Sequence, residues 1–157
     1  MESQVKYDST LDTTKHVKQV MNNLTEFSVD LLNRGKVHDL SKLQEPEKTG
    51  FDNAMAIKDI VYDSLEYRQS LEQLQETLKH HYEHNSHHPQ HYANGIEDMT
   101  LMDIVEMYCD WQAAVMRTKD GSFEQSVYIN TKRFNMSPQL AKIFLNTHNA
   151  QSNKGNQ

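Results

Sequence analysis

Histidine is concentrated in one short stretch of this sequence. Residues 79–92 read KHHYEHNSHHPQHY and hold six of the nine histidines in the chain. Neutral imidazole is the commonest protein ligand for transition metals, so the stretch could belong to a metal site. A solvated polar segment can also be rich in histidine. The cluster therefore indicates a metal site only if other segments supply carboxylates.

A histidine followed by an aspartate lies in the segment KVHDLSK, just after a predicted helix boundary. The adjacent side chains of His38 and Asp39 can reach one ion only if the local backbone is suitably bent, which the start of a helix allows. The dipeptide alone is a weak signal, because polar residues are also common as helix caps. His38 and Asp39 are thus candidate ligands that need support from other segments.

Three carboxylates share one face of an otherwise apolar helix predicted over residues 101–119. Asp103, Glu106 and Asp110 are spaced by three and four residues, which places them on the same side of a helix. Buried carboxylates are costly unless they are paired or bind a metal. A capping box with Thr100 can explain Asp103, whereas Asp110 lies in the middle of the helix and cannot form such a cap. Asp110 is therefore a candidate ligand or a member of a buried polar network.

The elements that must position these residues are predicted to be helices almost throughout. The chain has only five glycines and three prolines, and no stretch shows the sustained alternation of a strand. An apolar stripe on the first helix, from Val17 to Leu32, should face a core. Ser122 begins one later helix, and Ser137 caps the last one. We predict an all-α fold of about six longer helices, over residues 11–33, 46–61, 64–85, 101–119, 122–134 and from 137 onward, with a short helix over 37–42.

The length and charge of the chain limit what it can be. A chain of 157 residues can bury a sizeable core, so we predict a single domain over residues 1–157, with flexible tails at about 1–9 and 150–157. A formal net charge of −6 argues against binding to long nucleic acid or to an anionic membrane. No export signal or membrane-length apolar run is visible, and the single cysteine, Cys109, fits a reducing compartment. We expect a cytoplasmic protein.

With these residues in view, the chain resembles the HD-domain metal-dependent phosphohydrolases. The pattern of that superfamily is a histidine on one helix, an HD pair on the next and an aspartate on a later helix. The matching positions are His16 in TTKHVKQV, His38 and Asp39 in VHDLSK, and Asp110 in YCDWQAA. HDLSK is also similar to the HDxxK form, which puts Lys42 where a phosphate-binding lysine is often found. The likeness extends over nearly the whole chain to small HD-like proteins of phages and bacteria, and it implies an HD-domain-like fold.

The segment HHYEHNSHHP resembles the HH-containing segment of the two-metal branch of the same superfamily. The resemblance implies these metal ligands: His16, His38, Asp39, His80, His81 and Asp110. The two-metal branch usually has one more histidine between the HD and HH pairs, but residues 40–79 contain none. His84 or His88 could take that role. Whether the site holds one ion or two therefore stays open. The core prediction is a single-ion site whose ligands are His16, His38, Asp39 and Asp110.

The resemblance also implies a reaction. Asp39 and Lys42 would be the catalytic residues: Asp39 orients the water that a bound metal activates, and Lys42 stabilises negative charge on the phosphoryl group. Further substrate contacts would come from His84, His88, Arg34 and Arg117. The metal would be Mn, Fe, Co, Ni or Zn, because imidazole and carboxylate ligands suit all five. The implied activity is hydrolysis of a nucleotide or another small phosphoester by metal-activated water.

Two other functions stay open at this point. A minority of HD-fold proteins have similar ligands but are diiron oxygenases, which cleave C–C or C–P bonds with dioxygen. The other possibility is a metal-stabilised helical domain that binds a partner protein and catalyses nothing. Iron content together with oxygen consumption would identify the first. Retention of the biological effect in a folded variant without the HD pair would favour the second.

Overall fold

The computed structural model describes residues 8–56, 65–117 and 119–154, and the regular secondary structure of this part of the chain is helical, without strands. The all-α prediction is confirmed. Residues 57–61 of the helix predicted over 46–61 lie outside the described residues. Three short 3₁₀ helices, η1 (Leu40–Leu43), η3 (Pro89–His91) and η4 (Gly95–Asp98), lie in the connections. The α-helices are α1 (Thr10–Val37), α2 (Glu47–Ala56), α3 (Leu65–His84), α4 (Leu101–Met116), α5 (Phe123–Arg133) and α6 (Pro138–Lys154).

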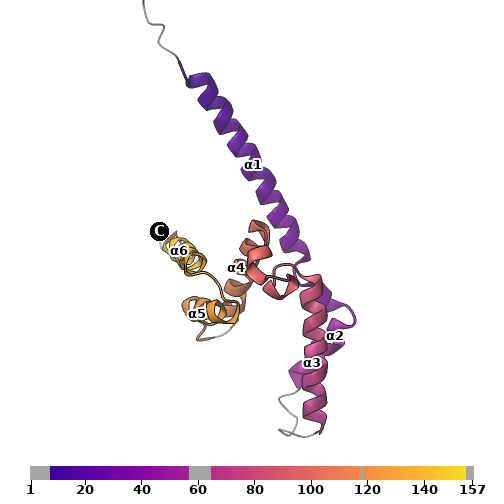
Figure 1. Cartoon of the computed structure of the whole chain (residues 1–157). Helices are drawn as coiled ribbons and strands as arrows, with labels where there is room; N and C mark the ends of the chain where they lie inside the picture. The colour runs from indigo at the N-terminus through magenta and orange to yellow at the C-terminus, as the bar shows by residue number, and fades with distance from the viewer. Residues whose placement is uncertain (1–7, 57–64, 118, 155–157) are drawn as a thin grey trace, which may run out of the picture. The chain divides into compact units, whose positions relative to one another are not determined.

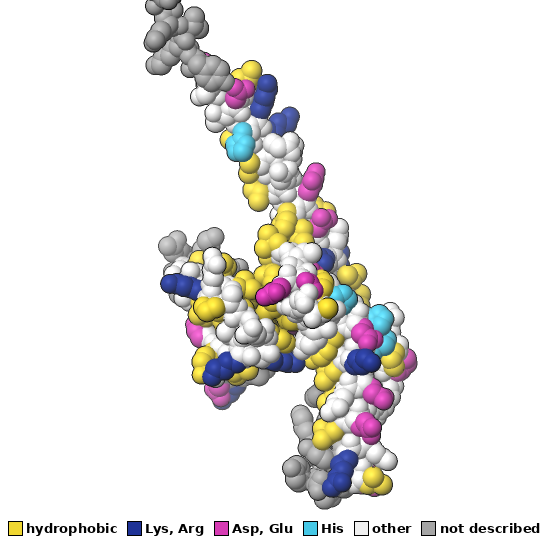
Figure 2. Space-filling view, viewed as in Figure 1, with side chains coloured by type: hydrophobic (Ala, Val, Ile, Leu, Met, Phe, Trp, Pro, Cys, Tyr) yellow, Lys and Arg dark blue, Asp and Glu magenta, His cyan; other side chains and the backbone are white. Residues whose placement is uncertain are grey.

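The chain divides into two compact units, residues 1–37 and residues 38–157, where the sequence predicts one domain. The first unit consists of α1 in its described part (Figure 1). None of the residues of α1 is buried, and Figure 2 shows apolar side chains along it. Val17 and Leu32, at the two ends of the predicted core-facing stripe, are 51% and 67% exposed. A single helix offers its own apolar stripe no second element to pack on.

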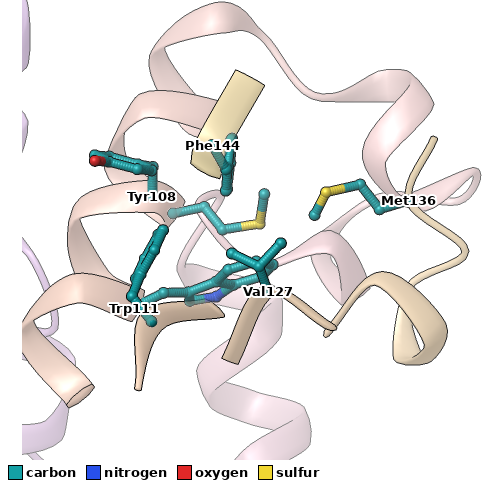
Figure 3. Close-up of a cluster of buried hydrophobic side chains, with 7 residues drawn as sticks. Tyr108, Trp111, Val127, Met136 and Phe144 are labelled. Atoms are coloured by element: carbon teal, nitrogen blue, oxygen red, sulfur yellow. The ribbon is translucent and has the colours of Figure 1, made fainter. Parts of the chain in front are cut away.

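The apolar core of the second unit is built by α4, α5 and α6. Tyr108 lies with its ring centre 5.3 Å from Phe123 and 5.2 Å from Phe144, in edge-to-face arrangements. Figure 3 shows Tyr108 and Phe144 in this core. Such aromatic pairs add about 0.5–1.5 kcal/mol beyond the burial of their area. The helix predicted over residues 101–119 is present as α4, but only one face of it is buried: Leu101 and Met116 are 65% and 86% exposed. The buried members of the core are Met107, Tyr108, Trp111, Phe123, Val127, Met136 and Phe144.

Helix starts agree with the sequence analysis. Thr100 caps α4 and forms the predicted capping box with Asp103. Ser122 accepts a hydrogen bond from the backbone N–H of Gln125 at the start of α5. Ser137 Oγ accepts one from the N–H of Leu140 at the start of α6. Each side-chain oxygen satisfies a backbone donor that the first turn of a helix leaves without an intrahelical partner.

Helix ends agree less well. The first helix passes Gly35 and ends at Val37, four residues beyond the predicted boundary. Helix α4 ends at Met116, before Lys119, the predicted end of this helix. The last helix continues to Lys154, through part of the segment predicted as a flexible tail from 150 onward. Helix ends are set by a few weak local interactions, so small differences shift them. Among the described residues, no helix combines the length and the apolar character needed to cross a membrane.

The other half of the second unit is the pairing of α2 with α3 (Figure 1), and it depends on a glycine. A Cβ atom at Gly50 would lie 1.9 Å from the Oγ1 atom of Thr77, so only glycine permits this approach. Glu47 lies one helical turn before Gly50, and His81 one turn after Thr77. The close crossing therefore brings Glu47 against the histidines at the end of α3.

Gly50→Ala should lower the free energy of unfolding by about 1–3 kcal/mol, because the added methyl group must push α2 away from α3. Chemical denaturation followed by circular dichroism measures the change. Gly35→Ala is the matched control, since a Cβ atom there meets no atom within 4 Å. In that helix the exchange should be neutral or stabilise by up to about 1 kcal/mol. Equal effects of the two substitutions would contradict the close crossing at Gly50.

Candidate metal centre

The HD pair lies at the start of the second unit, immediately before η1. Asp39 has a left-handed backbone conformation, with φ 58° and ψ 11°. Aspartate is one of the few residues other than glycine that adopt this conformation at modest cost. In this bend the Nε2 atom of His38 lies 3.6 Å from the Oδ2 atom of Asp39. Adjacent side chains can thus serve one site, as the sequence analysis required.

The described residues contain three groups of side chains that could hold a metal ion. In each group the potential donor atoms lie within 4.8 Å of one another, and Asp39, His38 and His87 each belong to two groups. The overlap makes one continuous cluster of donors, which all belong to the second unit. The groups are Asp39 with His81, His87 and His88; His38 with His87 and Glu106; and His38 with Asp39 and Asp110.

The two carboxylate oxygens of Asp39 face different neighbours. Its Oδ1 atom lies 3.3 Å from Nε2 of His81 and 3.5 Å from Nε2 of His87. Its Oδ2 atom lies near Nε2 of His38 and accepts a hydrogen bond from Nζ of Lys42 at 2.5 Å. Asp39 therefore joins two of the three donor groups, and it could serve one ion or bridge two.

Two glutamates orient the three imidazoles around Asp39. The Nδ1 atoms of His38 and His87 lie 2.8 Å and 3.2 Å from Oε1 of Glu106. The Nδ1 atom of His81 lies 2.8 Å from Oε2 of Glu47. A carboxylate can only accept, so Nδ1 must carry the hydrogen in each ring, which leaves the lone pair of a neutral imidazole on Nε2. Carboxylates commonly orient metal-binding histidines in this way.

Two buried donor atoms of the cluster have no hydrogen-bond partner among the described residues. They are Oδ1 of Asp39 and Nε2 of His87, which face each other. His87 is 2% exposed, so bulk solvent does not reach its ring. A buried polar atom without a partner costs about 1–3 kcal/mol and calls for an explanation such as a bound ion. Imidazole nitrogen and carboxylate oxygen are donors that fit a divalent transition metal.

The electrostatics of His38 follow from its carboxylate neighbours. Hydrogen bonds to Asp110 and to Glu106 raise the pKa of His38 to about 10. The Nε2 atom of His38 lies 3.6 Å from Oδ1 of Asp110. The site therefore attracts positive charge strongly, and in the metal-free protein the ring holds a proton at neutral pH. A metal ion that binds this nitrogen must displace that proton.

Two other donors are in the protonation state that a metal requires. Burial raises the pKa of Asp39, but the neighbouring His81, the ammonium group of Lys42 and the charge of His38 outweigh it and hold the pKa well below its usual range. Burial and the charges of His87 and His81 lower the pKa of His88 to about 3. Asp39 is thus a carboxylate and His88 a neutral imidazole at neutral pH. Both are ready to donate electron pairs.

Four of the six metal ligands implied by the resemblance lie in the donor groups: His38, Asp39, His81 and Asp110. His80 lies outside these groups, because its Nδ1 atom bonds to Oε1 of Glu47 at 2.9 Å and its ring stacks on that of His84. His16 is exposed and belongs to α1, in the first unit. Its ligation stays a prediction.

The predicted substrate-binding residues are spread over the chain. His88 lies in the donor cluster, with Nε2 2.9 Å from Nε2 of His81. His84 binds the backbone oxygen of His80 through Nδ1. Lys42 contacts Asp39, as described above. Arg34 lies on α1 in the first unit, and Arg117 is the exposed residue that follows the last residue of α4.

Two residues of the donor cluster, His87 and Glu106, and the adjoining Glu47 were missed as site residues. His87 belongs to a second HH pair, and its adjacency to His88 was a usable signal. Glu106 lies on the helix face that already drew attention to Asp103 and Asp110. Glu47 gives no local signal, because a glutamate after proline at the start of a helix is ordinary. Its role depends on the crossing of α2 and α3.

Asp103 has a structural role distinct from that of Asp110. It is 1% exposed and accepts hydrogen bonds from the N–H and the hydroxyl of Thr100. Its other partners are the hydroxyls of Ser86 at 2.7 Å and Tyr92 at 2.8 Å. These bonds tie the connection between α3 and α4 to the start of α4. None of the donor groups in the described chain includes Asp103.

Asp103→Asn should lower the free energy of unfolding at neutral pH by about 2 kcal/mol, because hydrogen bonds to a buried charge weaken. Burial raises the pKa of Asp103, but its hydrogen bonds from Thr100, Ser86 and Tyr92 outweigh it and hold the pKa below the usual 3.8. This stabilisation is therefore complete above that pH and is lost as the pH falls further. Denaturation curves across this range should show the gap between wild type and variant closing in acid. A gap that widens in acid would contradict this role.

Zn²⁺ binding at neutral pH should release a proton from His38, since its raised pKa keeps the ring protonated until the metal arrives. Calorimetric titration in buffers with different heats of ionisation measures the protons released per ion. Glu106→Gln removes one of the two hydrogen bonds that raise this pKa, so fewer protons should be released. Equal release by both proteins would argue against His38 as a ligand held by Glu106.

Comparison with known proteins places the chain in a family. The model of a family of unknown function, DUF5662, matches residues 5–150, and the chain therefore belongs to that family. Neither the curated proteins nor the solved structures give a match.

Proposed function

We propose that this member of the DUF5662 family is a metal-dependent hydrolase of a small phosphoester, such as a nucleotide. The observation that carries the proposal is the pair of buried donor atoms that make no hydrogen bond within the described chain, Oδ1 of Asp39 and Nε2 of His87, 3.5 Å apart. They lie among imidazoles whose other nitrogens are held by carboxylates. Such an arrangement is costly in a protein that binds no cation and useful in one that does.

The proposed ligands are Asp39 and the side chains around it, which are His38, His81, His87, His88 and Asp110. They suit Mn, Fe, Co, Ni or Zn. The two oxygens of Asp39 face different groups, so the site has donors for one ion or for two. When bound, a divalent ion would lower the pKa of a water molecule and neutralise charge on phosphoryl oxygens.

The residues around the ligands would supply the remaining chemistry. Asp39 is held as a carboxylate by His81 and Lys42, so it can orient an attacking water by accepting its hydrogen. The Lys42 side chain is 38% exposed and lies beside Asp39, so its ammonium group can contact a phosphoryl oxygen without leaving the site. Its fixed positive charge would stabilise the negative charge that develops there.

The size of the expected substrate follows from charge. The formal net charge of −6 gives the chain little affinity for long nucleic acid, whose binding depends on many Lys and Arg contacts to phosphates. One lysine beside a cationic centre is sufficient for a single phosphoryl group. A mononucleotide, a cyclic dinucleotide or a comparable small phosphoester therefore fits better than a polymer.

Asp39→Ala and His38→Ala should each reduce bound metal to a small fraction of wild type. Loss of a direct ligand should exceed the roughly 10- to 100-fold loss of affinity typical of outer partners. Elemental analysis of protein purified without chelator measures the metal. His91→Ala is the control: His91 is exposed and its Nδ1 binds the backbone oxygen of Tyr82, outside the donor cluster. Wild-type metal content in the Asp39 and His38 variants would reject the site.

The reaction itself is tested with a panel of nucleotides and cyclic dinucleotides. Metal-loaded wild type should release phosphate or a nucleoside monophosphate from at least one of them, and Asp110→Asn should not. Asp103→Asn, on the same helix, should retain activity because its carboxylate holds the fold. Oxygen consumption without hydrolysis in iron-loaded protein would replace the proposal with an oxygenase. Metal binding without either activity would favour a binding domain.

A further inference from the structure

Glu47 is a fully buried carboxylate, 0% exposed, near the start of α2. Its Oε1 atom lies 2.9 Å from Nδ1 of His80, and its Oε2 atom lies 2.8 Å from Nδ1 of His81. Oε2 also accepts a hydrogen bond from the hydroxyl of Ser41 at 2.9 Å. Adjacent histidines of α3 are thus bound to the two oxygens of one carboxylate.

The two histidines differ in their surroundings. The side chain of His80 is 35% exposed and its ring stacks on that of His84. The side chain of His81 is 2% exposed, and its Nε2 atom faces Oδ1 of Asp39 at 3.3 Å. Glu47 therefore connects a histidine near the surface with one at the donor cluster.

We propose that Glu47 is a positioning residue for the metal centre: it fixes His81 as the tautomer with hydrogen on Nδ1, and it fixes the ring so that Nε2 faces Asp39. This proposal rests on the proposed function, because it assumes that His81 binds the metal. The carboxylate accepts from Nδ1, so the lone pair is left on Nε2. A negative partner also makes the ring a better electron donor to a metal.

The surroundings of Glu47 favour this role over simple attachment of α2 to α3. Joining two helices requires no charge, and a well-packed apolar side chain would avoid the desolvation of a buried carboxylate. Instead, the Ser41 hydroxyl donates to Glu47 and accepts from Nδ2 of Asn85, which also donates to the backbone oxygen of His81. These bonds hold the carboxylate and the backbone of His81 together. Both ends of the contact are therefore fixed.

The test uses Glu47→Gln, which keeps the volume of the side chain and removes its charge. Long-range proton–nitrogen NMR of the metal-free protein, in mildly alkaline solution, reports which ring nitrogen of His81 carries hydrogen. In wild type it should be Nδ1 alone, and in the variant a mixture of both tautomers. The dissociation constant for Zn²⁺, measured by competition with a chelator, should rise about 10- to 100-fold.

Two further variants separate positioning from other effects. His80→Ala removes the other partner of Glu47 but leaves its bond to His81, so tautomer and zinc affinity should stay as in wild type. Glu47→Asp keeps the charge but is too short to hold His81 in place, so its affinity should fall as in Glu47→Gln. Glu47→Asp also provides the tautomer measurement if the glutamine variant does not fold.

The outcomes distinguish the two proposals. Wild-type tautomer and affinity in Glu47→Gln, or an equal loss of affinity in His80→Ala, would overturn the positioning role while leaving the metal centre intact. Unchanged zinc affinity in Glu47→Asp would also overturn it, because charge alone would then suffice. A wild-type protein that binds no zinc or other divalent transition metal would overturn the metal centre, and with it the function proposed above.

Discussion

The pairing of buried carboxylates with imidazoles is the interaction on which the second unit depends. Asp39, Glu47 and Glu106 are acidic side chains removed from much of the solvent, and each meets at least one histidine ring nitrogen. Alone, each carboxylate would be costly to bury. Together with the imidazoles they link the HD turn, α2, α3 and α4. The same contacts that stabilise the fold therefore assemble the donor cluster.

This dependence is strongest where α2 meets α3. The apolar core is built around α4, α5 and α6. Among the described residues of α2 and α3, the buried ones are Glu47, Gly50, Thr77 and His81. No large apolar side chain is among them. Packing of this half thus depends on a close backbone approach and on a polar network. A bound ion would add to its stability, since metal binding and folding are coupled when ligands come from several elements.

Sequence patterns predicted the parts of the site that have local causes. The helices, the capping box at Thr100 and the candidacy of Asp110 follow from spacing and from the cost of burial. Glu47 could not be found in this way, because its partners lie 33 and 34 residues further along the chain and meet it only through the contact of Gly50 with Thr77. Within the described part of the first unit no second element covers the apolar stripe on α1, and periodicity shows which face is apolar but not what packs on it.

Asp103 and Asp110 show why spacing alone cannot assign function. Both lie on one face of α4, and both have a pKa below the usual range despite burial. The partners of Asp103 are hydroxyls and a backbone N–H. These groups hold the carboxylate in place and do not prepare it to bind a cation. The partner of Asp110 is His38, a ring whose own proton can be exchanged for a metal. Whether a buried carboxylate can take part in binding a cation therefore depends on whether that cation can replace the proton on its partner. The neighbouring residue decides this, and the helix that carries the carboxylate does not.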